Sequence, residues 1–568
     1  MSGTPRSATG LLLALFASAA FSAAWVAANS GKAVHVDDTF FLYWARTISP
    51  LPGESPVVTI NWDRFEEPLA SQTQHYMPGW AMLLSTARRA VGEDPRLLHW
   101  LQWPFATMFL VGAFMLARTF GAPPWATLLL CAVNPAFLLP TASLMADMPA
   151  MGLAIFGLAV WHAAPGIAGR ISAGLLIALG AWMKQSVLVL YPLLLFDPGV
   201  RVTRRPQDWI IAALSLALAG YYPNVPPRGA DNGSILGHVA WIVQSTWKWP
   251  LTGAKLSYLL ATAGAVLLTP VATVFALAAR RSPAPGDRVK AVLAAVVCIP
   301  VLARLGLWKK LLAPGVNLAG VPGTANDLWF YAAIALLLAW AWYALRPRRE
   351  GGSAHLGLWL LLNAAGFLFA TWTPAVRHLI PALPPLVMLY LSDLRRNCGE
   401  RAYRAGVGAA AIAGLWLSLS LAHADGTFAE WAKVAARRGA EVSAARKLPL
   451  ITTGSWGLRY YVEKAGGTVL GRASDPLARG AILLLPRLTD HRILPDALRR
   501  RSRTIEVLAC PYSRQWPFLL PARTLPPERM VAAFHGGHLW FPYAFSRAPF
   551  EEISVIVVAP ASTRRRNR

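Results

Sequence analysis

The sequence predicts a polytopic α-helical membrane protein with about 13 transmembrane helices and a small extracytoplasmic α/β domain at its C-terminal end. Hydrophobic residues make up 55% of the 568 positions, charged residues only 14%, and the mean hydropathy is +0.42. This composition excludes an ordinary soluble protein. The 24 tryptophans fit a membrane protein, because tryptophan concentrates where helix ends meet the membrane interface.

Apolar runs that can cross a membrane, at about 20 residues each, set the expected helices. The first run, 11–28, is also compatible with a signal peptide, because small residues follow it. A retained first helix is favoured, since only Arg6 precedes the run and many hydrophobic segments follow. The expected spans are 11–28, 97–117, 125–140, 149–164, 171–183, 185–197, 209–222, 256–279, 289–307, 328–345, 355–372, 378–393 and 405–423.

Short basic blocks between these runs set the expected topology, because basic loops stay in the cytoplasm. The alternation requires two short helices within 171–197, with Lys184 in the outer turn between them. The chain is then expected in the inner (cytoplasmic) membrane, with a cytoplasmic N-terminus. Topology also explains the net charge of +26, so a nucleic-acid partner is not expected. The basic blocks lie at 201–205, 280–290, 346–349 and 395–404.

The predicted domains are a transmembrane domain over 1–423, with an outer loop over 29–96, and an extracytoplasmic domain over 424–568. Thirteen crossings from a cytoplasmic N-terminus place this tail outside. An amphipathic stretch at 456–467 lies among short apolar segments, which favours a small α/β domain. The strand-like segments are 448–453, 481–486 and 553–560.

Polar residues gather on the expected outer face, whereas the opposite face is nearly all arginine. Asp37 and Asp38 follow the first apolar run, and an acid at the edge of a bilayer is costly enough to need a reason. Asp147 lies in a later outer turn. The remaining outer groups are Lys184, the pair Arg377 and His378, and the acids and histidine of the first loop, Glu54, Asp63, Glu66, Glu67 and His75.

Each of these residues also has a structural explanation. The acids Asp37, Asp38 and Asp147 stand where an acidic side chain can cap a helix. Lys184 and Arg377 are placed as ordinary interfacial cations that reach toward water. A loop histidine such as His75 is more often a structural residue than a ligand. The pattern of all of them together is therefore the informative observation.

The four cysteines do not indicate a further site. Two fall in apolar runs, one in a basic loop and one in the tail, and no two have the spacing of metal ligands. Neither a disulfide framework nor a zinc knuckle is expected. The cysteines are Cys131, Cys298, Cys398 and Cys510.

Several short motifs follow one another along the chain. They are Asp37-Asp38 with aromatics and Ala45-Arg46, a degraded His-Pro-Pro element at 75–79, Asn134-Pro135 with Asp147-Met148-Pro149, Gly180 with Lys184, Arg377-His378 with Pro381 and Pro384, and the tail segment 454–461. Their order and shared face resemble the GT-C superfamily of polyprenyl-phosphate-sugar-dependent glycosyltransferases. The resemblance is stronger to the branch of protein O-mannosyltransferases and the bacterial aminoarabinose transferase of lipid A. Asp38 departs from the Glu typical of this branch, which shortens the reach of that acid.

The resemblance implies inverting transfer of a sugar from a polyprenyl-phosphate donor to an acceptor hydroxyl at the outer face of the membrane. Asp37 would be the general base that takes the proton of the attacking hydroxyl. Lys184 and Arg377 would neutralise the lipid phosphate as it leaves. The activated sugar-phosphate bond would supply the energy, and the chain has no G-x-x-x-x-G-K-[ST] motif for ATP.

The resemblance also assigns the supporting residues. Asp38 and Asp147 would assist catalysis, or would hold a divalent metal if the enzyme uses one. His75 and His378 would contact the substrates. No cofactor is certain, because some relatives use a metal and others do not.

Two other kinds of function remain open. A secondary transporter predicts charged residues near helix centres and two halves of matching hydropathy, whereas the candidate acids here lie at helix ends. A lipid-linked glycan ligase keeps the membrane architecture without the early acidic pair. The sequence specifies neither sugar nor acceptor, so lipid, glycan and protein acceptors are all compatible with it.

Overall fold

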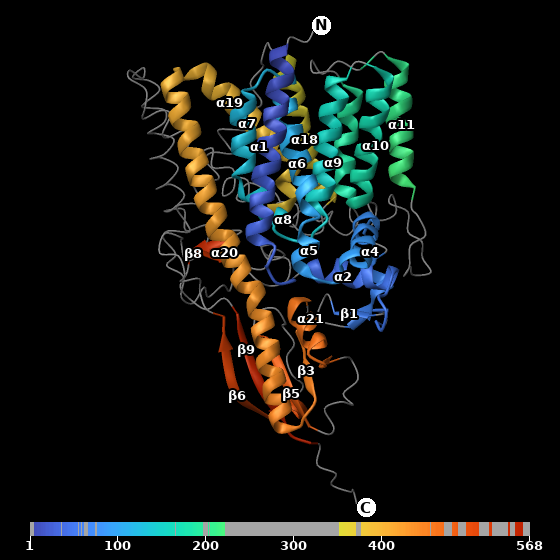
Figure 1. Ribbon diagram of the computed structural model, residues 1–568, viewed down its shortest axis with the longest axis vertical. Coiled ribbons are helices and arrows are strands. Elements are labelled where there is room, and N and C mark those ends of the chain that lie inside the picture. Colours follow the sequence, from blue (N-terminus) through green and yellow to red (C-terminus); the bar gives the residue numbers. More distant parts are fainter. Residues whose placement is uncertain are drawn as a thin grey trace, which may run out of the picture.

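A computed structural model describes most of the bundle and of the C-terminal domain (Figure 1). The predicted spans 256–279, 289–307 and 328–345 lie outside the described residues, as do His75 and the side chain of Asp37. The described ranges are 5–35, 37–54, 56–57, 59–61, 66–73, 76–164, 166–196, 203, 205–221, 351–370, 376–454, 456–470, 480–486, 496–510, 522–524, 543–545 and 551–560.

Apolar helices form a bundle in the upper part of the molecule, and a long helix leads from it into a lower sheet domain (Figure 1). Within the described ranges, three helices are long and apolar enough to cross a membrane, or four if one bent pair counts as a span. This indicates an integral membrane protein. The bundle helices are α1 (Pro5–Asn29), α6 (Gln102–Thr119), α7 (Pro124–Ala132), α8 (Pro135–Thr141), α9 (Asp147–Ala163), α10 (Ile167–Met183), α11 (Pro206–Gly220), α18 (Gly351–Ala370), α19 (Leu383–Asn397) and α20 (Glu400–Arg446).

Two breaks in these helices bear on the site. The span expected at 125–140 is two helices, α7 and α8, bent by 55° where Asn134 caps Pro135 and its side chain accepts a hydrogen bond from the amide of Ala136. The split expected within 171–197 is confirmed. Lys184 is extended after α10, and the 3₁₀ helix η1 (Gln185–Leu195) follows it.

Close packing joins the centre of the bundle. α6 and α9 approach so closely that a Cβ added to Gly152 would lie 2.2 Å from the carbonyl oxygen of Phe105. The Trp25 indole of α1 donates to the carbonyl of Leu138 in α8 at 2.8 Å. Small residues and buried indoles with partners are typical of helix interfaces in membranes. These close contacts hold the bundle helices together, and the loops of the site begin at the lower end of the bundle (Figure 1).

A layer of short elements lies between the bundle and the sheet domain (Figure 1). Its apolar core includes Phe40 and Trp44 of α2, Trp80 of α4, and Leu144 of the turn between α8 and α9, so three segments contribute to it. A Cβ on Gly79 would lie 2.7 Å from the carbonyl oxygen of Trp182, so this layer packs directly on the end of α10. The elements are α2 (Asp37–Ile48), β1 (Thr59–Asn61), β2 (Glu66–Pro68), α3 (Leu69–Thr73), α4 (Gly79–Val91) and α5 (Pro95–His99).

The helix expected to end at 423 does not end there. α20 runs for 47 residues without a break, and Lys447 closes it in the left-handed conformation. The predicted domain boundary at 423/424 therefore falls inside a continuous helix. The apolar run ends near Ala424, but no proline follows before Pro449, so the α-helical hydrogen bonds continue beyond the apolar segment.

The chain after α20 forms a five-stranded mixed sheet in the order β4-β3-β5-β9-β6. The strands expected in 448–453, 481–486 and 553–560 are confirmed as β3, β5 and β9, and α21 (Trp456–Lys464) lies in the amphipathic stretch. Ala435 and Ala436 of α20 and Leu458 and Val462 of α21 pack on the sheet. The strands are β3 (Leu450–Thr452), β4 (Thr468–Val469), β5 (Ala481–Pro486), β6 (Ser502–Ala509) and β9 (Glu552–Val558).

Candidate functional site

Asp38 is fixed at the start of α2, where the chain turns back from the first helix. Its side chain is 1% exposed. One carboxylate oxygen accepts the amide of Leu144 at 2.8 Å, and the other lies 3.3 Å from Nδ1 of His35. The amide of Asp38 also donates to the carbonyl of His35 at 3.1 Å. Residues 35–38 therefore form a turn closed by both backbone and side-chain contacts.

His35 continues this arrangement to the long helix. Its Nε2 lies 3.0 Å from Oδ1 of Asp425 on α20. The other oxygen of Asp425 is paired with the ammonium group of Lys32, which also donates to the carbonyl of Ala142 at 3.2 Å. Burial and the charge of Lys32 lower the pKa of His35, but Asp425 and Asp38 raise it by a larger amount, so that it lies above its ordinary value.

A second cluster joins three helical elements. The ammonium group of Lys184 donates to Oδ1 of Asp147 at 2.6 Å. Nε of Arg377, at the start of η2 (Val376–Ala382), lies 4.0 Å from the other oxygen of the same carboxylate. Asp147 is buried, whereas the side chains of Lys184 and Arg377 are 18% and 13% exposed. One carboxylate thus faces two cations.

The turn between α8 and α9 connects the two clusters. Its backbone binds Asp38 through Leu144, and three residues later Asp147 opens α9. The carbonyl of Leu144 accepts the Trp80 indole at 2.6 Å, and that of Met145 accepts the Gln102 amide at 3.0 Å. Side chains from α4 and α6 therefore hold this turn, and the distance between the acids depends on it.

The carboxylates expected as metal ligands are engaged differently. Asp38 accepts a backbone amide and contacts His35, while Asp147 accepts the ammonium group of Lys184. A divalent cation would have to displace these donors. Within the described ranges, no group of three or more His, Cys, Asp and Glu side chains is arranged to hold a metal ion. The contacts described for Asp38 and Asp147 therefore do not fit a metal site.

The tail segment singled out in the sequence docks on the first loop. The Tyr461 hydroxyl accepts the amide of Val34 at 2.9 Å. A Cβ on Gly457 would lie 2.9 Å from the carbonyl oxygen of Val34 and 3.2 Å from the α-carbon of His35. Glycine is thus required for the close approach of α21 to the turn that carries Asp38.

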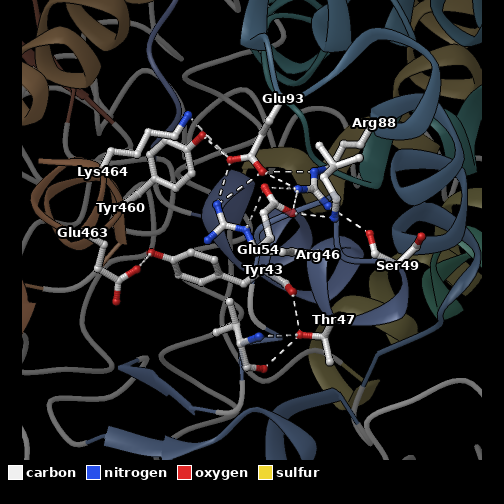
Figure 2. A network of polar contacts seen from close by, with 12 residues as sticks. Tyr43, Arg46, Thr47, Ser49, Glu54, Arg88, Glu93, Tyr460, Glu463 and Lys464 are labelled. Carbon is white, nitrogen blue, oxygen red and sulfur yellow. Dashed lines mark hydrogen bonds and ion pairs between the residues drawn. The ribbon is translucent and has the colours of Figure 1, made fainter. Parts of the chain in front are cut away.

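Figure 2 shows the polar network that holds α21 against α2 and α4. Glu93 is its centre and accepts the Tyr460 hydroxyl at 2.6 Å, Arg88 at 2.6 Å and Arg46 at 2.9 Å. Arg88 is fully buried and also binds Glu54 at 2.6 Å. Although burial raises the pKa of Glu93, the charge of Arg46, the hydrogen bond from Tyr460 and the charge of Arg88 lower it below its ordinary value.

A second contact of the same interface lies beside it. The Tyr43 hydroxyl donates to Glu463 at 2.6 Å (Figure 2). Arg459 donates to that carboxylate at 2.8 Å and to the carbonyl of Thr59 at 3.1 Å. Burial of Tyr43 and the charge of Glu463 raise the pKa of the phenol well above its ordinary value, so it remains a donor. The interface is therefore built from buried, partnered polar groups.

The structure brings together most of the residues expected at the site. Asp147, Lys184 and Arg377 form one cluster, and Asp38 lies at the other end of the same turn. The backbone of Asp37 begins α2, and the half-buried His378 follows Arg377 in η2.

Three residues beside the site were missed by sequence reasoning: Lys32, His35 and Asp425. Lys32 and His35 stand immediately before the acidic pair, and Asp425 follows the last predicted span. A charged residue bordering an apolar run is the signal that singled out Asp37, and it applied equally here.

A bundle of apolar helices with an ion-paired cluster at one end, covered by a sheet domain, defines an integral membrane protein with a polar site at the bundle end. No family model and no curated protein matches the chain. Solved structures match the chain at low sequence identity, and three of them are described below.

ArnT from Cupriavidus metallidurans bound to undecaprenyl phosphate is 14% identical, with a TM-score of 0.45, over 98% of this chain and 99% of its own. The same ArnT in the apo state is 14% identical, with a TM-score of 0.37, over 89% and 96%. The Archaeoglobus fulgidus oligosaccharyltransferase in complex with Zn and sulfate is 11% identical, with a TM-score of 0.38. The match covers 81% of this chain and 62% of that protein. At these TM-scores the likeness does not extend to the roles of individual residues.

Proposed function

We propose that this protein transfers a sugar from a polyprenyl-phosphate donor to an acceptor hydroxyl at the outer face of the inner membrane, with inversion. The observation that carries the proposal is the cluster in which one buried carboxylate, Asp147, faces both Lys184 and Arg377. A phosphate beside Lys184 and Arg377 would be attracted by both cations. Because the site is partly buried, that attraction is stronger than in water.

The chemical step needs a base and a stabilised leaving group. As the acceptor oxygen bonds to the anomeric carbon, the bond from that carbon to the phosphate oxygen breaks, and the hydroxyl proton passes to the carboxylate of Asp37. The electron pair of the broken bond remains on the lipid phosphate. Arg377 suits two phosphate oxygens and Lys184 supplies a point charge, so both stabilise the charge that develops there.

Asp147 has a supporting part in this mechanism. Its contact with Lys184 at 2.6 Å keeps the ammonium group beside Arg377 despite the repulsion between two cations. Asp38, which is adjacent to the proposed base in the sequence, anchors the start of α2 to the turn at Leu144. His378 follows Arg377 and contacts the substrate in this proposal, whereas His75 is retained as a substrate residue on the resemblance of its motif alone.

The main alternative is a secondary transporter. Transporter sites use charges near the middle of the membrane, where discontinuous helices meet. Here Asp147 opens α9 and Lys184 follows the end of α10, next to the layer of α2 and α4. Charges at the bundle end favour chemistry at a membrane surface. A lipid-linked glycan ligase would keep the membrane architecture but would not need the early acidic pair, Asp37 and Asp38.

Transfer from a radiolabelled polyprenyl-phosphate sugar tests the proposal. Undecaprenyl phosphate, which the ArnT neighbour binds, is the carrier to use first. Asp37→Asn is expected to abolish transfer while leaving expression intact, whereas Asp94→Asn, which changes only a helix cap, is expected to retain it. Undiminished transfer by Asp37→Asn would remove that residue from the mechanism. Uptake into proteoliposomes without a covalent product would establish the transporter instead.

The proposed contact of the cations with the donor phosphate is tested by the apparent KM for the donor. Arg377→Ala is expected to raise the apparent KM for the donor more than that for the acceptor. Arg404→Ala, at an exposed ion pair near the start of α20, is the matched control. Equal losses for donor and acceptor would contradict a role at the donor phosphate. Mass spectrometry of envelope glycans after deletion of the gene identifies the acceptor.

A further inference from the structure

Four buried side chains form a continuous chain beside the proposed base: Lys32, Asp425, His35 and Asp38. Each is less than a tenth exposed, and each contacts the next by an ion pair or hydrogen bond. They come from the loop after α1, from α20 and from α2. His35 and Asp425 are separated by 390 residues in sequence, so this chain exists only in the folded protein.

Electrostatics explain why these groups occur together. A buried charge without a partner is costly, whereas a balanced and hydrogen-bonded set is tolerated. With His35 protonated, two cations face two carboxylates and the set is neutral. Asp425 and the hydrogen bonds to both acids raise the pKa of His35 above its ordinary value of 6.5 against the effects of burial and Lys32. The imidazolium is therefore the form that completes the set.

Other groups also face His35. His99, the last residue of α5, interacts electrostatically with Asp38 and His35. From the tail, α21 approaches so closely that a Cβ added to Gly457 would lie 3.2 Å from the α-carbon of His35, and the Tyr461 hydroxyl accepts the amide of Val34. The turn at 35–38 is thus held from α5, α20 and α21, and α20 supplies the carboxylate that binds the imidazole directly.

We propose that Lys32, His35 and Asp425 are positioning residues that fix the turn at 35–38 and so place Asp37 for catalysis, which rests on the transferase function proposed above. His35 and Asp38, the described residues that stand on either side of positions 36 and 37 in the sequence, are both held by side-chain contacts. The amide of Asp38 binds the carbonyl of His35, and the carboxylate of Asp38 binds Leu144 in the turn that leads to Asp147. The unit therefore fixes the start of α2 relative to the Lys184 and Arg377 cluster.

Kinetics of the full-length protein distinguish positioning from a purely structural role. Asp425→Asn is expected to lower kcat by about 100-fold, as a small misplacement of a catalytic group does, with little change in the donor KM. Asp425→Glu is expected to recover part of that loss. Glu430→Gln, at an exposed ion pair on the same helix, is the matched control and is expected to retain the wild-type kcat.

A separate variant is needed to control for misfolding, because a single buried charge without its partner destabilises the protein. The double variant Lys32→Met/Asp425→Asn removes one charge of each sign, so it is expected to fold, by melting temperature and size exclusion, and to keep the low kcat. A wild-type kcat in that double variant would overturn the positioning role. If the wild-type chain forms no glycosyl product, the proposed function itself fails, which is a different result.

Discussion

Glu93 offers the sharpest test of how the tail is held against the membrane domain. Its carboxylate binds Tyr460 of α21 at 2.6 Å and Arg88 of α4 at 2.6 Å, and its side chain is 9% exposed. The variant Glu93→Gln keeps the shape of the side chain but removes the charge. Arg88, which is fully buried, then keeps only Glu54 as a carboxylate partner.

The expected loss follows from burial. Removing one partner from a buried ion pair costs about 3–5 kcal/mol. We expect a cost at the lower end of this range, because Arg88 retains Glu54. The contact of Glu93 with the half-exposed Lys464 contributes little. A loss of about 3 kcal/mol corresponds to roughly a 100-fold increase in the population in which α21 is undocked.

Amide hydrogen exchange measures this directly. Protection of α21 in Glu93→Gln is expected to fall roughly 100-fold after correction for intrinsic rates. Glu441→Gln, at an exposed pair with Arg438, is the control and is expected to cost less than about 1 kcal/mol. Equal protection in the two variants would refute the network as the force that holds the tail.

The same carboxylate predicts an effect of pH. The pKa of Glu93 is lowered in the folded protein, so its contribution is complete above the ordinary value of 4.5 and is lost as pH falls through the lowered value. Protection of α21 in the wild type is therefore expected to drop under acid conditions. In Glu93→Gln, this part of the drop is expected to be absent.

Three further predictions concern the site. Gly457→Val is expected to expose α21 to exchange and to reduce transfer, because its Cβ would meet the Val34 carbonyl at 2.9 Å; unchanged protection would contradict the close approach. Lys184→Met is expected to raise the donor KM and Lys184→Arg to raise it less, since arginine keeps the charge; equal values in steady-state assays would argue against a phosphate contact. EDTA is expected to leave transfer unchanged, because Lys184 already occupies the Asp147 carboxylate at 2.6 Å; loss of activity that Mg²⁺ or Mn²⁺ restores would show that a metal is needed.

Local patterns in the sequence predicted several elements correctly. The break at Lys184 followed from the alternation of basic loops, and the strands of the tail followed from short apolar runs between polar segments. The end of α20 was predicted wrongly. Hydropathy marks where apolar residues stop, but a helix ends where its backbone hydrogen bonds stop, and nothing near Ala424 interrupts them.

The sequence by itself determined the membrane class, the candidate acids and cations, and the resemblance to GT-C enzymes, because composition and short motifs are local properties. Only the tertiary structure decided which of these residues meet. Asp147 binds Lys184 across 37 residues, and Asp425 reaches His35 across 390. Such contacts depend on how helices pack and where turns are held, and no periodicity along the chain encodes them. Asp38 is thus connected to Asp425 of α20, through His35, only in the folded protein.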